Sequence, residues 1–138
     1  MISVNNPEET IRKILSDTKT IAVVGFSSRP EKAGDYVPAY LQGQGYRIIP
    51  VNPNLEEALG EKVYADLPSI SGPVDVVLIF RRSEAVPLFV EQAIQTGAKA
   101  VWMQLGIANE EAASKARAAG LDVVMDRCMM VEHRKFKA

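Results

Sequence analysis

Cysteine, histidine and tryptophan each occur only once in this sequence of 138 residues. The single cysteine, Cys128, excludes an intramolecular disulfide. No run approaches the roughly 18 apolar residues of a membrane span, and the first residues do not form an apolar leader, so neither a span nor a signal peptide is expected. These absences favour a cytoplasmic protein.

An excess of positive charge is also missing. The 16 Lys and Arg residues face 17 Asp and Glu residues, which leaves a formal net charge of -1 and no basic surface for nucleic acid. The length fits one domain that buries about two-thirds of its unfolded surface. We therefore expect a small-molecule ligand, with no nucleic acid and no membrane as partner. A homodimer is the commonest assembly of such domains.

The end of the chain, residues 132–138, is rich in basic residues. This stretch predicts a solvated tail. It contains the only histidine, His133, which is then left without ordered surroundings. A Ser-His or Cys-His nucleophilic pair is accordingly not expected.

Five short apolar segments alternate with stretches of helical periodicity. They cover residues 20–24, 46–51, 74–80, 100–103 and 121–125. Unbroken apolar segments of this length are typical of parallel strands that are buried on both faces. A βαβ series with right-handed crossovers predicts the α/β class. We expect a single Rossmann-like domain over residues 1–138, with a five-stranded parallel sheet in the order 3-2-1-4-5 and helices on both faces.

Three local features add to this prediction. Asn6 stands at an N-cap position before Pro7, which predicts the first helix over residues 6–18. Pro50 lacks an N–H, so the second strand should lie where the sheet can spare a ladder bond. Glycines and prolines interrupt residues 55–73, which predicts a loop with short regular pieces.

The first strand ends abruptly at Gly25, where the backbone can approach a ligand closely. Donors follow it, from hydroxyl and cationic side chains: Ser27, Ser28, Arg29 and Lys32. A helix that begins near Asp35 would point its N-terminal amides at the same place. This combination predicts a phosphate site.

The residues after the first two strands do not match a dinucleotide fingerprint. That fingerprint needs G-x-G-x-x-G and then an acidic residue at the end of the second strand. Residues 25–30 hold one glycine, and Asn52 stands where the acid is needed. NAD is therefore disfavoured, and a P-loop is absent as well, although a nucleotide-binding oxidoreductase module remains an alternative. Coenzyme A, with a pyrophosphate and a 3′-phosphate, suits a site with several cations. The candidates are Arg29, Lys32, Arg81 and Arg82.

Five separated motifs resemble the stand-alone CoA-binding proteins, which are similar to the N-terminal CoA-binding domain of the succinyl-CoA synthetase α subunit. The motifs are residues 22–27, 46–54, 60–64, 97–106 and 124–128. The resemblance extends from about residue 10 to residue 133. It departs at Ser28, where the synthetase loop is richer in glycine, and at Gly34, where family members often carry serine.

The resemblance implies roles for residues at the ends of four strands. Those implied to hold the phosphates are Gly25, Phe26, Ser27, Arg29, Pro30 and Lys32. Those implied to flank the adenosine and its base are Val51, Asn52, Pro53, Phe80 and Arg81. Gln104 and Gly106 are implied to contact the pantetheine arm. The phosphohistidine domain of the synthetase has no counterpart in 138 residues, so ligase activity by this chain alone is not expected.

Cys128 is the one candidate for catalysis. It follows the fifth strand on the ligand side, and Arg127 beside it would favour the thiolate. A small buried hydrophobe is the alternative role. The sequence has no CxxC or HExxH motif, so no metal is expected. Two hypotheses follow besides the oxidoreductase module: a binding, accessory or sensor protein for CoA or acyl-CoA, and a Cys128-dependent thiol- or acyl-transfer enzyme.

Overall fold

Five parallel strands lie side by side at the centre of the protein. In spatial order they are β2 (Arg47–Val51), β1 (Thr20–Val24), β5 (Val76–Ile79), β6 (Ala100–Met103) and β7 (Asp122–Val124). The computed structural model describes residues 7–137. Asn6, which was expected to cap the first helix, lies outside the described residues.

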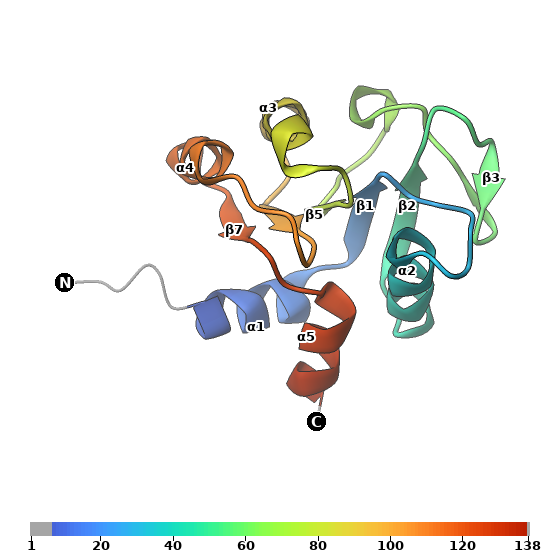
Figure 1. The fold of residues 1–138 in the computed structure, drawn as a ribbon, viewed down its shortest axis with the longest axis horizontal. Helices are drawn as coiled ribbons and strands as arrows, with labels where there is room; N and C mark the ends of the chain where they lie inside the picture. The colour runs from blue at the N-terminus through green and yellow to red at the C-terminus, as the bar shows by residue number, and fades with distance from the viewer. Residues whose placement is uncertain (1–6, 138) are drawn as a thin grey trace.

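Helices cover both faces of this sheet (Figure 1). One face packs against α1 (Pro7–Asp17), α2 (Ala33–Gly43) and α5 (Met129–Lys137). The other packs against the short helix η1 (Leu67–Ser69), α3 (Val86–Thr96) and α4 (Glu110–Ala118). Short pieces complete the fold: β3 (Glu57–Ala58) and β4 (Glu61–Lys62), which pair with each other, and η2 (Ser83–Ala85). Among the helices of residues 7–137, none has the length and apolar character needed to cross a membrane.

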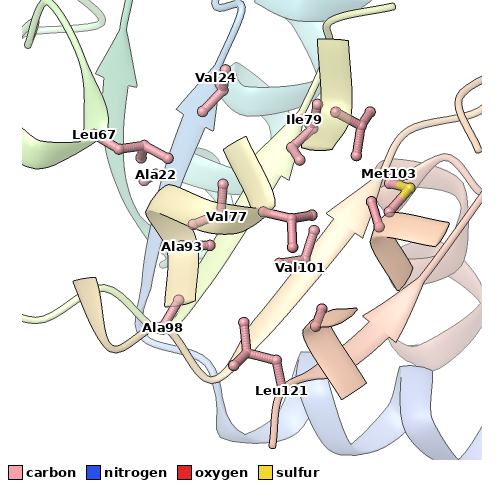
Figure 2. Close-up of a cluster of buried hydrophobic side chains, with 14 of the residues drawn as sticks. Ala22, Val24, Leu67, Val77, Ile79, Ala93, Ala98, Val101, Met103 and Leu121 are labelled. Carbon is pink, nitrogen blue, oxygen red and sulfur yellow. The ribbon is translucent and has the colours of Figure 1, made fainter. Parts of the chain in front are cut away.

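The two helical layers enclose two separate cores. In β1, Ile21 and Val23 point into the core under α1, α2 and α5, whereas Ala22 and Val24 point into the opposite core. Figure 2 shows the second core, where side chains from β1, β5 and β6 meet those of α3 and η1. Because both faces of each strand are buried, the strands read as unbroken apolar runs in the sequence.

The expected α/β class, with a five-stranded parallel sheet and helices on both faces, is confirmed. The expected strand order needs a correction. Numbered along the chain, the five strands lie in the order 2-1-3-4-5 and not 3-2-1-4-5. The third of them, β5, pairs with β1, where Ile79 lies opposite Val24, and does not pair with β2.

Pro50 gives the physical reason for this order. Along β2 the backbone groups alternate between its two sides: the N–H of Arg47 donates to Lys19 of the β1 side, and that of Asn52 donates outward to Tyr64. The nitrogen of Pro50 therefore faces outward, where only its carbonyl is used, as acceptor from the Tyr64 N–H. The outer side of the sheet tolerates the missing donor, whereas the order 3-2-1-4-5 would place it inside the sheet.

The C-terminal residues also differ from the prediction. Instead of a solvated tail they form α5, and Glu132 and His133 are only 5% and 7% exposed. Met129, His133 and Phe136 follow an i, i+4, i+7 spacing, which places them on one face of the helix. The neighbouring charged residues obscure this spacing in the sequence.

Candidate functional site

The order of the strands reverses between β1 and β5. In open parallel sheets, ligands bind beyond the carboxyl ends of the strands at such a switch point. The loops that flank it here are residues 25–32 after β1 and residues 80–82 after β5. The structure thus brings the Gly25 loop and Arg81 together, whereas Gln104 and Gly106 follow β6, one strand farther from β1.

Gly25 and Arg81 are in direct contact across the switch point. Gly25 has a φ of +81°, and a Cβ at this position would lie 3.0 Å from Cδ of Arg81 and 3.2 Å from the carbonyl carbon of Phe80. The absence of a side chain at Gly25 therefore makes room for the stem of Arg81. The guanidinium continues to Phe89 of α3, with its carbon 5.6 Å from the ring centroid.

The loop after β1 is fixed by its own hydrogen bonds. The Ser27 N–H donates to the Gly34 carbonyl at 3.2 Å, and the Ser27 hydroxyl accepts from the Arg29 N–H at 3.2 Å. A Cβ on Gly34 would lie 3.0 Å from the Gly25 carbonyl oxygen. A serine at Gly34 would therefore require the loop to shift, so the glycine at this position fits the close approach of the helix start to the loop.

The N-terminus of α2 faces the same loop. The helix begins at Ala33, two residues before the expected start near Asp35, which lies in the first turn, and Lys32 is its N-cap. The first N–H groups of the helix, those of Ala33 and Gly34, have no partner within it and carry the positive end of the helix dipole. An anion beside residues 32–34 would meet these donors.

Exposed side chains surround this point. They are Ser28, Arg29, Pro30 and Lys32 on one loop, and Arg81 and Arg82 on the other. Arg29 forms an ion pair with Glu31, with 3.0 Å between Nε and Oε2, and 69% of its side chain is exposed. A ligand phosphate would therefore compete with the carboxylate of Glu31 for this guanidinium.

The end of β2 and the residues after it contact the loop that follows β1, residues 25–32. Val51 and Phe26 are buried in the cores, at 4% and 2% exposure, so their side chains are not available to a ligand. Asn52 donates from Nδ2 to the Phe26 carbonyl at 2.8 Å and accepts the Asn54 N–H at 2.7 Å. Asn52 therefore joins the loops after β1 and β2, and exposed Pro53 follows it.

Gln104 and Gly106 are engaged in contacts within the protein. Gln104 is 4% exposed, and its Oε1 accepts the N–H of Met129, the first residue of α5, at 3.3 Å. The Gly106 N–H donates to the carboxylate of Asp126 at 2.7 Å. These contacts connect the end of β6 to the segment that leads into α5.

Cys128 is partly buried beside the core under α5. Its carbonyl accepts the N–H of Glu132 at 3.0 Å, so it precedes α5 as the cap residue. The guanidinium of Arg127 reaches Glu8 at 3.2 Å and Glu132 at 3.5 Å. The cation that was expected to favour the Cys128 thiolate is thus held by two carboxylates.

His133, expected to have no ordered surroundings, lies in a buried aromatic cluster. Its Nδ1 lies 2.9 Å from the Tyr40 hydroxyl, and the rings of Tyr40 and Tyr46 meet it edge-on. Burial lowers the pKa of His133 below its usual value, and the nearby ammonium of Lys137 adds to this effect. The histidine therefore serves the contact between α2 and α5.

Two cavities lie away from the switch point. One of about 660 Å³ follows the outer edge of β7 beside α1, and one of about 370 Å³ lies near Asp75 at the opposite end of the strands. Neither is lined by a residue that the sequence predicts to bind a cofactor. The candidate site therefore rests on the two loops at the switch point and on neither of these two cavities.

Sequence reasoning missed two residues of this site. Phe89 lies in α3, which follows the loop of Arg81 along the chain, and apolar periodicity predicts its packing against the core but not its contact with Arg81. Gly34 was treated only as a departure from a family pattern. The run of small residues Ala33 and Gly34 directly before a helical stripe is the one feature that indicates close packing of the helix start on the loop.

Known proteins resemble the chain over most of its length. A family model described as CoA binding domain matches residues 19–134. The Bacillus subtilis (strain 168) protein YneT is 45% identical over 129 residues, which are 93% of this chain and 96% of YneT. A solved structure of a hypothetical protein from Pyrococcus horikoshii OT3 has a TM-score of 0.92 at 42% identity and covers 100% of this chain and 98% of its own.

Longer enzymes share a part of the chain. The alpha subunit of acetate–CoA ligase [ADP-forming] II from Pyrococcus furiosus is 40% identical over 84 residues, which are 59% of this chain and 17% of that subunit. This chain therefore spans less than a fifth of the length of that subunit.

Proposed function

Because this chain belongs to the CoA binding domain family, we propose that it binds coenzyme A or an acyl-CoA at the carboxyl ends of β1 and β5. It acts as a small cytosolic binding, accessory or sensor protein and holds the ligand without transforming it. One observation carries the proposal: the Gly25 loop, the start of α2 and exposed cations meet at the switch point of the sheet. A pyrophosphate and a 3′-phosphate complement this arrangement.

The contacts of the loop suggest how the ligand is divided among its residues. The Ser27 N–H donates to the Gly34 carbonyl and is not available to the ligand. The phosphates are therefore bound by Ser28, by the first turn of α2, and by the cations Arg29 and Lys32. The side chains of Phe26, Val51 and Asn52 hold the loop in place from the protein interior and do not touch the ligand. Gly25, Pro30 and Pro53 shape the backbone around it.

The other end of the ligand extends toward β6 in this proposal. Phe80 and Arg81 flank the adenine, and the pantetheine arm passes the loop of Gln104 and Gly106. The side chain of Gln104 already accepts the Met129 N–H, so this loop contacts the arm through its backbone. The loop of Gln104 and Gly106 therefore determines the direction in which the pantetheine arm leaves the site.

Calorimetric titration with CoA, NAD and NADP side by side tests the proposal. We expect binding of CoA with no measurable heat from NAD or NADP, because Asn52 is engaged with the backbone where a dinucleotide site needs a ribose-binding acid. Tight binding of NAD or NADP without CoA would favour the oxidoreductase alternative. Absence of heat from all three ligands would also refute the proposal.

The enzyme alternative depends on Cys128. Its neighbour Arg127 is paired with Glu8 and Glu132, and His133 is held by Tyr40, so neither of these two side chains is placed to activate the thiol. Cys128→Ser should leave CoA affinity unchanged, and no thioester turnover should be lost. Turnover by the wild type that disappears in Cys128→Ser would establish the enzyme instead.

A homodimer is part of the proposal as well. It can be tested independently of the ligand, because light scattering measures the mass of the protein in solution. A mass twice that of the 15.1 kDa chain supports the dimer, and the mass of one chain refutes it.

A further inference from the structure

Arg81 has the best-defined position among the exposed cations at the switch point. Its stem lies against Gly25, where Cδ is 3.0 Å from the place of a Cβ, and its guanidinium carbon lies over the Phe89 ring at 5.6 Å. These two contacts, one near each end of the side chain, restrict a group that otherwise has many rotamers. The side chain is thus restrained near both ends before any ligand arrives.

The Phe89 ring lies on one side of this guanidinium. Arg81 itself is exposed, so its other side is open to a ligand at the carboxyl edge of the sheet. Arginine stacks on planar aromatic groups because its guanidinium is flat, delocalised and weakly hydrated. Nucleic-acid bases stack on arginine planes for the same reason.

We propose that the outer face of Arg81 is a stacking platform for the purine base of the ligand, and that Phe89 is a positioning residue that holds this platform flat. The inference rests on the proposed CoA binding and deepens it. It assigns the base to a layered arrangement of the Phe89 ring, the Arg81 plane and the adenine. Phe89 acts through Arg81 and does not touch the ligand.

A phosphate contact of Arg81 would make a different prediction. An ammonium replaces a guanidinium as a point charge beside a phosphate, but it offers no plane for a base. Arg81→Lys therefore separates the two roles. The ligand 4′-phosphopantetheine tests a contact with the phosphate next to the pantetheine arm, because it keeps that phosphate but lacks both the adenine and the 3′-phosphate. Dephospho-CoA tests the 3′-phosphate, because it keeps the adenine and lacks only that group; a stacking platform predicts the same loss for CoA and dephospho-CoA.

The experiment compares CoA, dephospho-CoA and 4′-phosphopantetheine as ligands of four proteins: wild type, Arg81→Lys, Phe89→Leu and Phe89→Tyr. We expect Arg81→Lys to lose about tenfold in affinity for CoA and Phe89→Leu to lose somewhat less. Both should bind 4′-phosphopantetheine like the wild type. Phe89→Tyr keeps an aromatic ring under the guanidinium and should retain the affinity for CoA.

A spectroscopic readout accompanies the titrations. Stacking lowers the ultraviolet absorbance of adenine, so CoA bound to the wild type should show this decrease, and CoA bound to Phe89→Leu should show less of it. Phe136→Leu serves as a control, because Phe136 is an aromatic residue of α5 on the opposite helical layer. Thermal unfolding of each variant identifies any loss of affinity that is due to a loss of structure.

The outcomes distinguish this inference from the proposed function. If the wild type binds CoA and both Arg81→Lys and Phe89→Leu bind it equally well, the stacking platform is wrong and CoA binding stands. Equal losses for CoA and 4′-phosphopantetheine, or a loss for CoA that dephospho-CoA does not share, would also overturn the platform and assign Arg81 to a phosphate. If the wild type binds neither ligand, the proposed function fails, and this inference fails with it.

Discussion

The Tyr40 hydroxyl lies 2.9 Å from Nδ1 of His133 and joins α2 to α5 across 93 positions of the chain. The guanidinium of Arg134 lies over the same tyrosine ring at 5.2 Å, and Lys137 lies close enough to the imidazole to disfavour its charge. A buried imidazole between cations is stable in its neutral form. The contact between the two helices therefore depends on the protonation state of one residue.

This arrangement predicts a loss of stability in mild acid. Burial and the charge of Lys137 hold the pKa of His133 below the usual 6.5, so the folded protein binds this proton less tightly than the unfolded chain does. The contribution of His133 is complete above about pH 6.5 and is lost as the pH falls toward its folded pKa. Urea unfolding at about pH 7.5 and about pH 5.5 measures this change.

The matched control is His133→Gln, which keeps a polar group but does not titrate in this range. We expect it to be less stable than the wild type at neutral pH, because the contacts with the two tyrosine rings are lost. Its stability should change less between the two pH values. Equal changes in both proteins would show that other groups cause the pH dependence.

Asp75 should contribute to stability at the opposite end of the sheet. Its Oδ2 accepts the N–H groups of Lys19 at 2.9 Å and Thr20 at 3.1 Å, where β1 begins. Asp75→Ala removes both hydrogen bonds, and we expect a loss of about 2 kcal/mol in the free energy of unfolding. Asp75→Asn keeps an acceptor and should lose less. Affinity for CoA should be unchanged in both, because this end of β1 is remote from the candidate site.

The pH dependence of Asp75 has the same sign as that of His133 but lies at lower pH. Burial alone raises the pKa of Asp75, but the two backbone N–H groups and the ammonium of Lys99 outweigh it, so the pKa lies below the usual 3.8. Its stabilising contribution is present above about pH 3.8 and is lost as the pH falls toward the lower folded pKa. The difference in stability between the wild type and Asp75→Ala should therefore shrink in strong acid.

The sequence anticipated the local features of the fold better than the contacts between distant segments. The five strands and most helices could be located, because apolar runs and helical periodicity are local properties of the chain. Asn109 illustrates such a local signal: it is an N-cap residue type directly before two glutamates, and its side chain accepts the N–H of Ala112 in α4. His133 was not expected to be buried, since its partners Tyr40 and Tyr46 are far away in the sequence.

The order of the strands could not be predicted from local patterns either, because it depends on contacts between segments that are far apart in the sequence. Pairing of β1 with β5 is a relationship between segments about 55 positions apart, and the hydrophobic pattern is the same for every buried strand. Pro50 was the one residue that restricted the order, because it requires an outer position for β2. The contact of Gly25 with Arg81 follows from that order and could not be deduced without it.

Gly34 should be intolerant of any side chain. A Cβ there would lie 3.0 Å from the Gly25 carbonyl oxygen, which is backbone and cannot yield easily. We expect Gly34→Ala to lose about 1–3 kcal/mol of stability and to weaken CoA binding, because the loop must shift. Gly43→Ala in the same helix is the control, since nothing lies within 4 Å of its added Cβ, and it should be neutral or stabilising. Similar effects of the two substitutions would contradict the steric explanation.

Arg29 should discriminate between CoA and dephospho-CoA if it faces the 3′-phosphate. Arg29→Ala would then weaken the binding of CoA more than that of dephospho-CoA, because only the first ligand carries the missing charge partner. Arg117→Ala in the last turn of α4 removes a cation at the other end of the sheet and should affect neither ligand. Equal losses for both ligands in Arg29→Ala would place this cation at the pyrophosphate.

Substitution of Glu31 should strengthen CoA binding, whereas substitution of Arg29 should weaken it. Its carboxylate lies 3.0 Å from Nε of Arg29, so it competes with a ligand phosphate for the guanidinium and repels the phosphate itself. Glu31→Gln removes the negative charge and keeps the size of the side chain. We expect it to strengthen CoA binding severalfold, with a smaller gain at high salt because the pair is exposed and screened. In the double variant with Arg29→Ala most of the gain should disappear, since the competition for Arg29 no longer exists. A gain of the same size in the double variant would show that Glu31 acts on the phosphate alone.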